Sequence, residues 1–229
     1  MTLTDIALPK AVLWDMDGTL VDTEPYWIAA EKRLVASFGR SWTDEQSLQL
    51  VGNDLEGSAA VLQGAGVAMP VPAIVERLTD EVIAQLAERG VPFRPGAKEL
   101  LASLRAVGVK TAIVTMSRHR MAERVVNTID FDAFDAILGG DDVERPKPFP
   151  DPYLAGAAAL GVDIADCVAL EDSPTGLASA VASGAAAIGV EHLVALDGIG
   201  ARAVWTSLAG RTPDDLGRIW SAARSEERA

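Results

Sequence analysis

Short apolar runs alternate with longer amphipathic stretches along most of this chain. Six runs have the length and apolar character of strands buried on both faces of a parallel sheet, and they lie at 11–15, 109–115, 136–138, 167–171, 185–190 and 203–205. Proline, glycine and hydroxyl residues between them mark helices over 97–107, 118–128, 152–160, 175–183 and 214–223. This alternation predicts a doubly wound α/β fold.

Residues 24–91 break the alternation and contain no convincing strand. Thr43 and Gln46 have the spacing of a capping box before a short helix. Apolar side chains then recur every four residues from Ile74 to Leu86, as on the buried stripe of an amphipathic helix. We therefore expect an all-helical insert at 24–91 within a core formed by residues 1–23 and 92–229.

Composition narrows the classes of function. The 229 residues carry a net charge of −13, and 49% of them are apolar, as in a folded globular protein. This acidity disfavours binding to nucleic acid or to an anionic membrane surface. A single cysteine excludes an intramolecular disulfide, and we see no secretory signal at the N-terminus. We expect a cytoplasmic monomer without a nucleic-acid or membrane partner.

The segment after the first predicted strand carries the strongest chemical signal. Asp15 and Asp17 are two residues apart, so they share a face if the backbone there is extended. At the carboxyl end of a parallel strand, one carboxylate can act as a nucleophile while the other carries a proton. A divalent cation would offset the repulsion between them. The alternative is a turn with two solvated acids.

Three further polar segments follow other predicted strands. Thr115 and Ser117 precede a helix, where hydroxyls and free N–H groups suit a phosphate, although Ser117 could simply cap that helix. Lys147 lies in a proline-rich loop that fixes its direction, so it could neutralise a phosphoryl oxygen or remain a surface lysine. Glu171 and Asp172 lie at the end of a buried strand. They could be metal ligands, or they could be acids stabilised by the dipole of the following helix.

These motifs together resemble those of the haloacid dehalogenase superfamily, in its β-phosphoglucomutase-like phosphatase branch. The stretch from Asp15 to Pro25, reading DMDGTLVDTEP, resembles the first motif, and Thr115, Lys147 and the Glu171-Asp172 pair match the other three. The resemblance extends from Val12 to about Val190. It implies a Rossmann-like three-layer core with a parallel sheet and an inserted helical cap, in agreement with the insert expected at 24–91.

The resemblance also implies Mg²⁺-dependent phosphoryl transfer. Asp15 would attack phosphorus to form an aspartyl phosphate, and Asp17 would protonate the leaving oxygen and then activate water. Thr115 and Lys147 would hold phosphoryl oxygens. Because a halide leaving group needs no proton, the presence of Asp17 argues for a phosphoester substrate rather than a haloacid.

A Mg²⁺ site is implied by the same motifs. Its ligands would be Asp15, the backbone carbonyl of Asp17 and Asp172, with Glu171 nearby and able to act through a water molecule. Oxygen ligands with retained waters are what Mg²⁺ prefers.

Phosphatase and mutase activities differ in what the cap must hold. β-Phosphoglucomutases have a histidine at the place that Trp27 occupies here, and a cap arginine shortly after a glycine. Gly52 is followed instead by Asn53, Asp54, Leu55 and Glu56. Since a mutase must bind a second phosphate with cap cations, the sequence favours hydrolysis of a small phosphorylated metabolite, with a phosphosugar mutase and a non-catalytic module as alternatives.

Substrate contacts from the cap are expected from Trp27, Asn53 and Asp54, and from the core at Ser117, Arg118 and His119. Each has a structural alternative. Trp27 could be a core aromatic, Asn53 and Asp54 could cap a helix, and Arg118 and His119 could lie on a solvated helix face.

Overall fold

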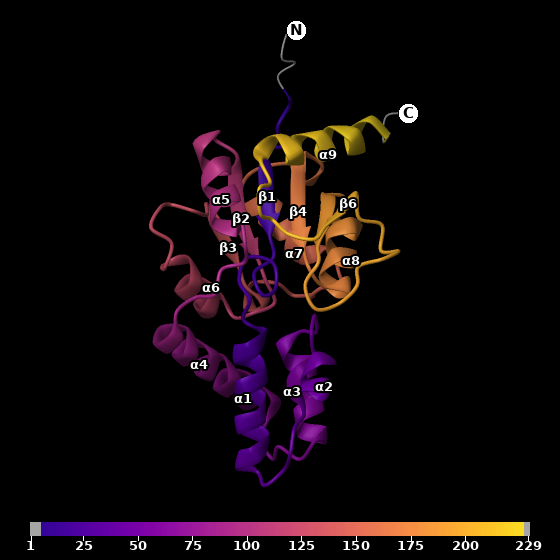
Figure 1. Ribbon diagram of the computed structural model, residues 1–229. Helices are drawn as coiled ribbons and strands as arrows, with labels where there is room; N and C mark the ends of the chain where they lie inside the picture. The colour runs from indigo at the N-terminus through magenta and orange to yellow at the C-terminus, as the bar shows by residue number, and fades with distance from the viewer. Residues whose placement is uncertain (1–5, 227–229) are drawn as a thin grey trace.

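A parallel sheet lies at the centre of the computed structural model, which describes residues 6–226 (Figure 1). Its strands lie in the order β3-β2-β1-β4-β5-β6, and every neighbouring pair is parallel. The strands are β1 (Ala11–Trp14), β2 (Lys110–Val114), β3 (Ala136–Leu138), β4 (Cys167–Glu171), β5 (Ala186–Val190) and β6 (Ala203–Trp205). The predicted α/β fold is confirmed, and each strand begins and ends within one residue of the predicted position.

Helices cover both faces of the sheet. On one face lie α5 (Ala97–Ala106), α6 (His119–Val126) and α9 (Pro213–Glu226), and on the other lie α7 (Asp151–Ala159) and α8 (Pro174–Ser183). Alternate residues of β1 serve the two layers, because Val12 and Trp14 pack into one apolar cluster and Ala11 and Leu13 into the other. Short 3₁₀ turns at Gly140–Asp142 and Ile164–Asp166 complete the core.

Four helices separate β1 from α5, and they lie together beyond the carboxyl edge of the sheet (Figure 1). They are α1 (Glu24–Ser37), α2 (Asp44–Leu48), α3 (Leu55–Gly64) and α4 (Val71–Arg89). No strand is found among residues 24–91, all of which are described. The capping box of Thr43 and Gln46 is present before α2, and the stripe from Ile74 to Leu86 is buried on α4. Among residues 6–226, no helix combines the length and apolar character of a membrane span.

Candidate active site

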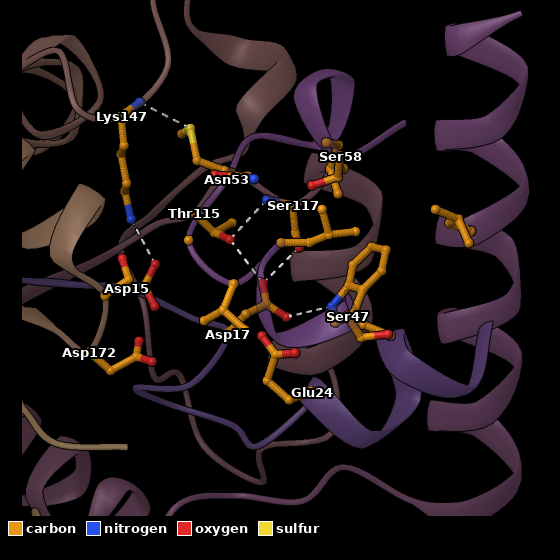
Figure 2. Close-up of a pocket in the computed structure, with 18 of the residues that line it drawn as sticks. Asp15, Asp17, Glu24, Ser47, Asn53, Ser58, Thr115, Ser117, Lys147 and Asp172 are labelled. Carbon is orange, nitrogen blue, oxygen red and sulfur yellow. Dashed lines mark hydrogen bonds and ion pairs between the residues drawn. The ribbon is translucent and has the colours of Figure 1, made fainter. Parts of the chain in front are cut away.

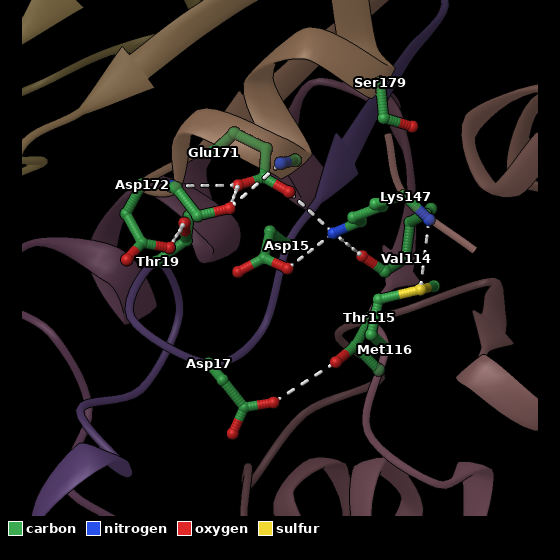
Figure 3. Close-up of polar contacts among 12 residues, drawn as sticks. Asp15, Asp17, Thr19, Val114, Thr115, Met116, Lys147, Glu171, Asp172 and Ser179 are labelled. Atoms are coloured by element: carbon green, nitrogen blue, oxygen red, sulfur yellow. Dashed lines mark hydrogen bonds and ion pairs between the residues drawn. The ribbon is translucent and has the colours of Figure 1, made fainter. Parts of the chain in front are cut away.

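The polar motifs of the sequence converge at the carboxyl edge of the sheet (Figure 3). Asp15 follows β1, Thr115 follows β2 and Asp172 follows β4, while Lys147 lies in the loop before α7. Because β1 pairs in parallel with both β2 and β4, these strands end side by side. Residues from four distant parts of the sequence therefore meet at one place.

Lys147 is buried and fixed by three acceptors. Its Nζ donates to Asp15 Oδ1 at 2.7 Å, to the Val114 carbonyl at 2.9 Å and to Glu171 Oε1 at 2.6 Å. Burial disfavours the ammonium charge, but the Asp15 and Glu171 carboxylates outweigh it and hold the pKa of Lys147 above its ordinary value. The ammonium is thus a fixed positive charge directly beside Asp15.

Glu171 is fully buried, and both of its carboxylate oxygens accept hydrogen bonds. Besides Lys147, Oε1 accepts from the Tyr153 hydroxyl at 2.9 Å, and Oε2 accepts from the backbone N–H and the hydroxyl of Ser173, each at 3.2 Å. A Cβ at Gly176 would lie 1.8 Å from Oε1, so only glycine leaves room for this carboxylate. Glu171 therefore orients Lys147.

Three carboxylates surround a place that suits a divalent cation. Asp15, Glu171 and Asp172 each offer an oxygen, and these oxygens lie within 4.8 Å of one another. Asp15 Oδ2 is buried without a hydrogen-bond partner among the described residues. Burial, with the charge of Glu171, raises the pKa of Asp15 well above its usual range and that of Asp172 to about 8. A cation would offset this repulsion, and an all-oxygen donor set fits Mg²⁺.

Asp172 lies against the turn that follows Asp17. Its Oδ1 accepts from the Thr19 hydroxyl at 2.9 Å. Gly18 has a φ of +95°, and a Cβ there would lie 2.0 Å from Asp172 Oδ2. Both the backbone conformation and the close approach require glycine.

The Asp17 carboxylate lies apart from the three acids and faces the cavity described below (Figure 2). It accepts from the hydroxyls of Ser117 at 2.7 Å and Thr115 at 3.2 Å, from Trp27 Nε1 at 3.3 Å, and from the Thr23 hydroxyl. Four donors from two segments, the start of α1 and the loop after β2, hold it in one orientation.

A cavity separates the sheet edge from the inserted helices (Figure 2). The volume of the cavity that the centres of water molecules can occupy is about 100 Å³. Because one water molecule needs about 10–15 Å³ of such volume, a small organic ligand fits. We call one side the sheet wall, formed by Asp15, Asp17, Thr115, Ser117, Lys147 and Asp172. We call the other the helical wall, with polar residues Glu24, Glu31, Ser47, Asn53 and Ser58 and apolar residues Trp27, Leu50, Val51, Leu55 and Leu78.

The substrate-contact residues expected from the sequence divide between the cavity and its surroundings. Trp27, Asn53 and Ser117 line the cavity. Ser117 does not cap α6, since the N-cap is Arg118 and no side-chain cap forms; the Ser117 hydroxyl bonds Asp17 instead. Asp54 is the N-cap of α3 and accepts from the Gly57 N–H at 2.8 Å, so it has the capping role that was the alternative to substrate contact.

Arg118 and His119 are not among the residues that line the cavity. Arg118 forms ion pairs with Glu56 of α3 at 2.6 Å and Glu76 of α4 at 3.7 Å. The His119 ring bonds the Asp142 carboxylate at 2.6 Å. Arg118 therefore connects the core to the inserted helices, while His119 belongs to the core surface.

Sequence reasoning missed the acids and hydroxyls of the helical wall. Glu24, Trp27 and Glu31 occupy positions i, i+3 and i+7 of α1, which lie on one helix face. That spacing is the signal that could have found the two glutamates. Ser47 and Ser58 reach the cavity from α2 and α3 through the packing of these helices, and no sequence pattern identifies them.

Known proteins share this fold and this sequence pattern. The family described as haloacid dehalogenase-like hydrolase matches residues 12–190. Hexitol phosphatase B of Escherichia coli is 34% identical over 178 residues, covering 76% of this chain and 79% of that protein. A crystal structure of a CbbY mutant from Rhodobacter sphaeroides in complex with xylulose-(1,5)bisphosphate has a TM-score of 0.81 and 27% identity, covering 89% of this chain and 96% of that one. β-Phosphoglucomutase from Clostridium difficile shares the fold, with a TM-score of 0.82 at 20% identity, over 95% of this chain and all of that one.

Proposed function

Since the chain belongs to the haloacid dehalogenase-like hydrolases and is a phosphoric monoester hydrolase, we propose that it hydrolyses a small phosphorylated metabolite of the sugar-phosphate class. We propose further that the reaction depends on Mg²⁺ and proceeds through an aspartyl phosphate. Hexitol phosphatase B supports the substrate class by its name and its 34% identity. The one observation that carries the mechanism is the buried, unpartnered Oδ2 of Asp15 beside the fixed ammonium of Lys147.

The first step transfers the phosphoryl group to Asp15. Asp15 Oδ2 bonds to phosphorus while the bond from phosphorus to the substrate oxygen breaks, and Asp17 gives its proton to that leaving oxygen. Lys147 and the Thr115 hydroxyl hold phosphoryl oxygens, so the group is positioned and its charge is neutralised. Lys147 also holds Asp15 Oδ1, which leaves Oδ2 as the oxygen without a hydrogen-bond partner among the described residues.

The second step releases phosphate. Asp17, now ionised, accepts a proton from a water molecule that attacks phosphorus, and the bond from phosphorus to Asp15 Oδ2 breaks. The four donors around the Asp17 carboxylate keep it on the cavity side through both steps. Asp15 is restored as a carboxylate, and Asp17 is protonated for the next cycle.

Asp15, the Asp17 carbonyl and Asp172 would hold Mg²⁺, while Glu171 is engaged by Lys147, Tyr153 and Ser173. When bound, the ion supplies positive charge that stabilises the phosphoryl oxygens and keeps Asp15 ionised.

We also propose that residues 24–91 act as a cap over a core of residues 1–23 and 92–229. Hydrolysis is favoured over a mutase reaction because Lys147 is the one basic side chain among the described residues that line the cavity. A non-catalytic module does not agree with the phosphatase relationships. The monomeric state, the cytoplasmic location and the absence of a nucleic-acid partner stay predictions.

The test compares wild type with Asp15→Asn in the hydrolysis of p-nitrophenyl phosphate, with and without Mg²⁺. We expect Mg²⁺-dependent turnover that falls by at least about a thousandfold in the variant, because the nucleophile is lost. Undiminished turnover by Asp15→Asn, or no turnover by wild type, would overturn the mechanism. Release of glucose 6-phosphate rather than free phosphate from β-glucose 1-phosphate would establish a mutase instead.

A further inference from the structure

Two linkers join the inserted helices to the core, and they lie side by side. One leads from β1 to α1, and the other leads from α4 to α5. The Asp22 N–H of the first linker donates to the Pro92 carbonyl of the second at 2.8 Å, and the Arg94 N–H of the second donates to the Leu20 carbonyl of the first at 2.9 Å. The covalent connection between the two parts of the molecule therefore passes through one short paired segment.

One side chain from each linker lies on the same face of this paired segment. Val21 and Phe93 are directly opposite each other in an antiparallel bridge. Successive side chains of a paired backbone alternate between two faces, so Asp22 and Arg94, each one residue beyond the bridge, share the other face. A group that binds both Asp22 and Arg94 thus holds the two linkers together.

His192 binds both of these side chains from the loop after β5. Its Nε2 lies 3.2 Å from Asp22 Oδ1, and its Nδ1 is in hydrogen-bond contact with Arg94 Nη1. Arg94 Nη2 also donates to the carbonyl of Glu191, in the same loop, at 2.8 Å. The His192 side chain is 10% exposed. We call Asp22, Arg94 and His192 the linker clasp.

A neutral imidazole with its proton on Nε2 satisfies both contacts of the clasp. Arginine has N–H donors and no acceptor, so Nδ1 must accept from Arg94, while Nε2–H donates to the Asp22 carboxylate. Arg94 and Asp22 are the charged groups that face the ring among the described residues. Burial and the charge of Arg94 lower the pKa of His192 from its ordinary value despite Asp22, so the neutral ring prevails at neutral pH. In acid, a second ring proton would meet an Arg94 N–H, and the clasp would open.

The clasp ends one residue before a direct contact with Asp17. Thr23 follows Asp22 and is the N-cap of α1, and its hydroxyl donates to the Asp17 carboxylate. Trp27, in the first turn of α1, donates to the same carboxylate from Nε1 at 3.3 Å. A displacement of this linker would therefore move two of the four donors that orient Asp17.

We propose that His192 is a positioning residue for the hydrolytic reaction: its neutral ring holds the two linkers together and so keeps Thr23 and Trp27 where they orient Asp17. This inference rests on the proposed function. His192 lies outside the four motifs and outside residues 12–190, over which the family matches. Its loss should matter most where the leaving oxygen needs a proton from Asp17.

The experiment compares kcat/KM for phenyl phosphate and p-nitrophenyl phosphate at saturating Mg²⁺. Phenolate needs a proton from Asp17 as it leaves, whereas the much less basic p-nitrophenolate leaves without one. At pH 7.5, His192→Ala should lower kcat/KM for phenyl phosphate by about threefold to thirtyfold and for p-nitrophenyl phosphate by less than about twofold. A general disturbance of the fold would lower both values alike.

His192→Gln is the conservative variant, because its amide oxygen can accept from Arg94 while its NH₂ group donates to Asp22. At pH 7.5 it should keep at least about half of the wild-type kcat/KM for phenyl phosphate. From pH 7.5 to pH 5, its kcat/KM relative to wild type should rise by at least about twofold, because acid protonates the histidine and not the amide. His119→Ala and His119→Gln are the matched controls, since His119 is the other histidine of the chain and lies outside the cavity; both should behave as wild type.

Three outcomes would overturn the inference: wild-type kcat/KM in His192→Ala, an equal loss for the two phosphoesters, or no rescue by His192→Gln. If His192→Ala does not fold, the comparison of His192→Gln with wild type decides, and identical pH profiles would overturn the inference. These failures are distinct from failure of the proposed function. If turnover depends on Asp15 and the His192 variants behave as wild type, the phosphatase mechanism stands and the role of the clasp is wrong. If Asp15→Asn retains wild-type turnover, the mechanism itself is wrong.

Discussion

Both walls of the cavity carry carboxylates, but among the described residues that line it only the sheet wall has a basic side chain that compensates their charge. On the sheet wall, Lys147 is buried among Asp15, Glu171 and a carbonyl, and Gly18 and Gly176 let the carboxylates approach closely. On the helical wall, Glu24 and Glu31 have no basic neighbour among the residues that line the cavity. The fixed ammonium of Lys147 makes the sheet wall suitable for phosphoryl transfer. Because the helical wall has no basic side chain, it suits the uncharged part of a substrate.

The walls also differ in what holds them. The sheet wall is built at the ends of parallel strands, whose backbone pairing fixes the residues that follow. The helical wall is built on side chains of separate helices, and its position relative to the sheet depends on contacts such as the ion pairs between α6 and α4. Changes to the sheet wall should therefore abolish the reaction, whereas changes to the helical wall should alter selection and closure.

Loss of the fixed cation should have the largest effect. We expect Lys147→Met to lower kcat/KM for any phosphoester by about 10²–10³-fold, because a preorganised charge is lost. It should also lower the free energy of unfolding by about 3–5 kcal/mol, since Asp15 and Glu171 are left buried without their partner. Steady-state kinetics and denaturant unfolding measure the two effects. Retained activity in a folded variant would contradict the role given to the sheet wall.

The unpaired acids should make the metal-free protein less stable as pH rises. Burial raises the pKa of Glu24 to about 8, with Asp17 adding to the effect, and burial with Glu171 does the same for Asp172. The folded state holds these protons where the unfolded state has lost them. The free energy of unfolding should therefore fall between about pH 4, the ordinary value for such acids, and pH 8.

Thermal unfolding in EDTA checks this dependence. Between pH 6 and pH 8 the Tm should fall by on the order of a few degrees. The fall should be smaller in Glu24→Gln, and Mg²⁺ should raise the Tm more at pH 8 than at pH 6, because a larger fraction of Asp172 is ionised at pH 8. An identical fall in wild type and Glu24→Gln would contradict the assignment of Glu24 as an uncompensated acid.

The ion pairs between core and inserted helices should give the smallest effect. Arg118 contacts Glu56 and Glu76, and Arg120 contacts Glu76 at 3.0 Å and Asp80 at 2.7 Å. Exposed pairs contribute about 0–1 kcal/mol each. We therefore expect Arg118→Gln/Arg120→Gln to raise KM by only a few-fold while kcat changes little.

The control for that variant is Arg124→Gln, which removes a charge from an exposed position of the same helix. Added salt should weaken the ion pairs of wild type and so reduce its difference in KM from the double variant. An equal rise of KM in Arg124→Gln would mean that net charge, and not the contacts to α3 and α4, is responsible.

The same contrast explains what the sequence could predict. Asp15, Thr115 and Asp172 lie just after buried strands, so the alternation of strands and helices could place them at one edge of the sheet. Lys147 lies in the loop before α7, and its place at the site was expected from its proline-rich surroundings and the family resemblance. Ser117 could be expected at the site, but its bond to Asp17 depends on a contact across 100 positions of the sequence. His119 is adjacent to the site in sequence, yet the first turn of α6 directs its ring to Asp142.

The helical wall could be predicted only in part. The capping box predicted α2, and the apolar stripe predicted α4. Neither pattern determines how α1, α2 and α3 pack against one another. Glu31 faces the cavity because Trp42 and Ser47 meet it there, and these residues share no motif. Two residues proposed for this side, Trp27 and Asn53, do line the cavity, whereas Asp54 serves as a helix cap.

Identification of the phosphorylated residue tests the central claim most directly. Wild type and Asp17→Asn would be mixed with Mg²⁺ and p-nitrophenyl phosphate, whose leaving group departs without a proton from Asp17, then quenched in acid and digested for peptide mass analysis. We predict one phosphoryl group on Asp15, at higher occupancy in Asp17→Asn because the base that activates water is lost. A phosphoryl group on a different residue, or turnover by wild type with no phosphoryl group on Asp15 in either protein, would contradict the account.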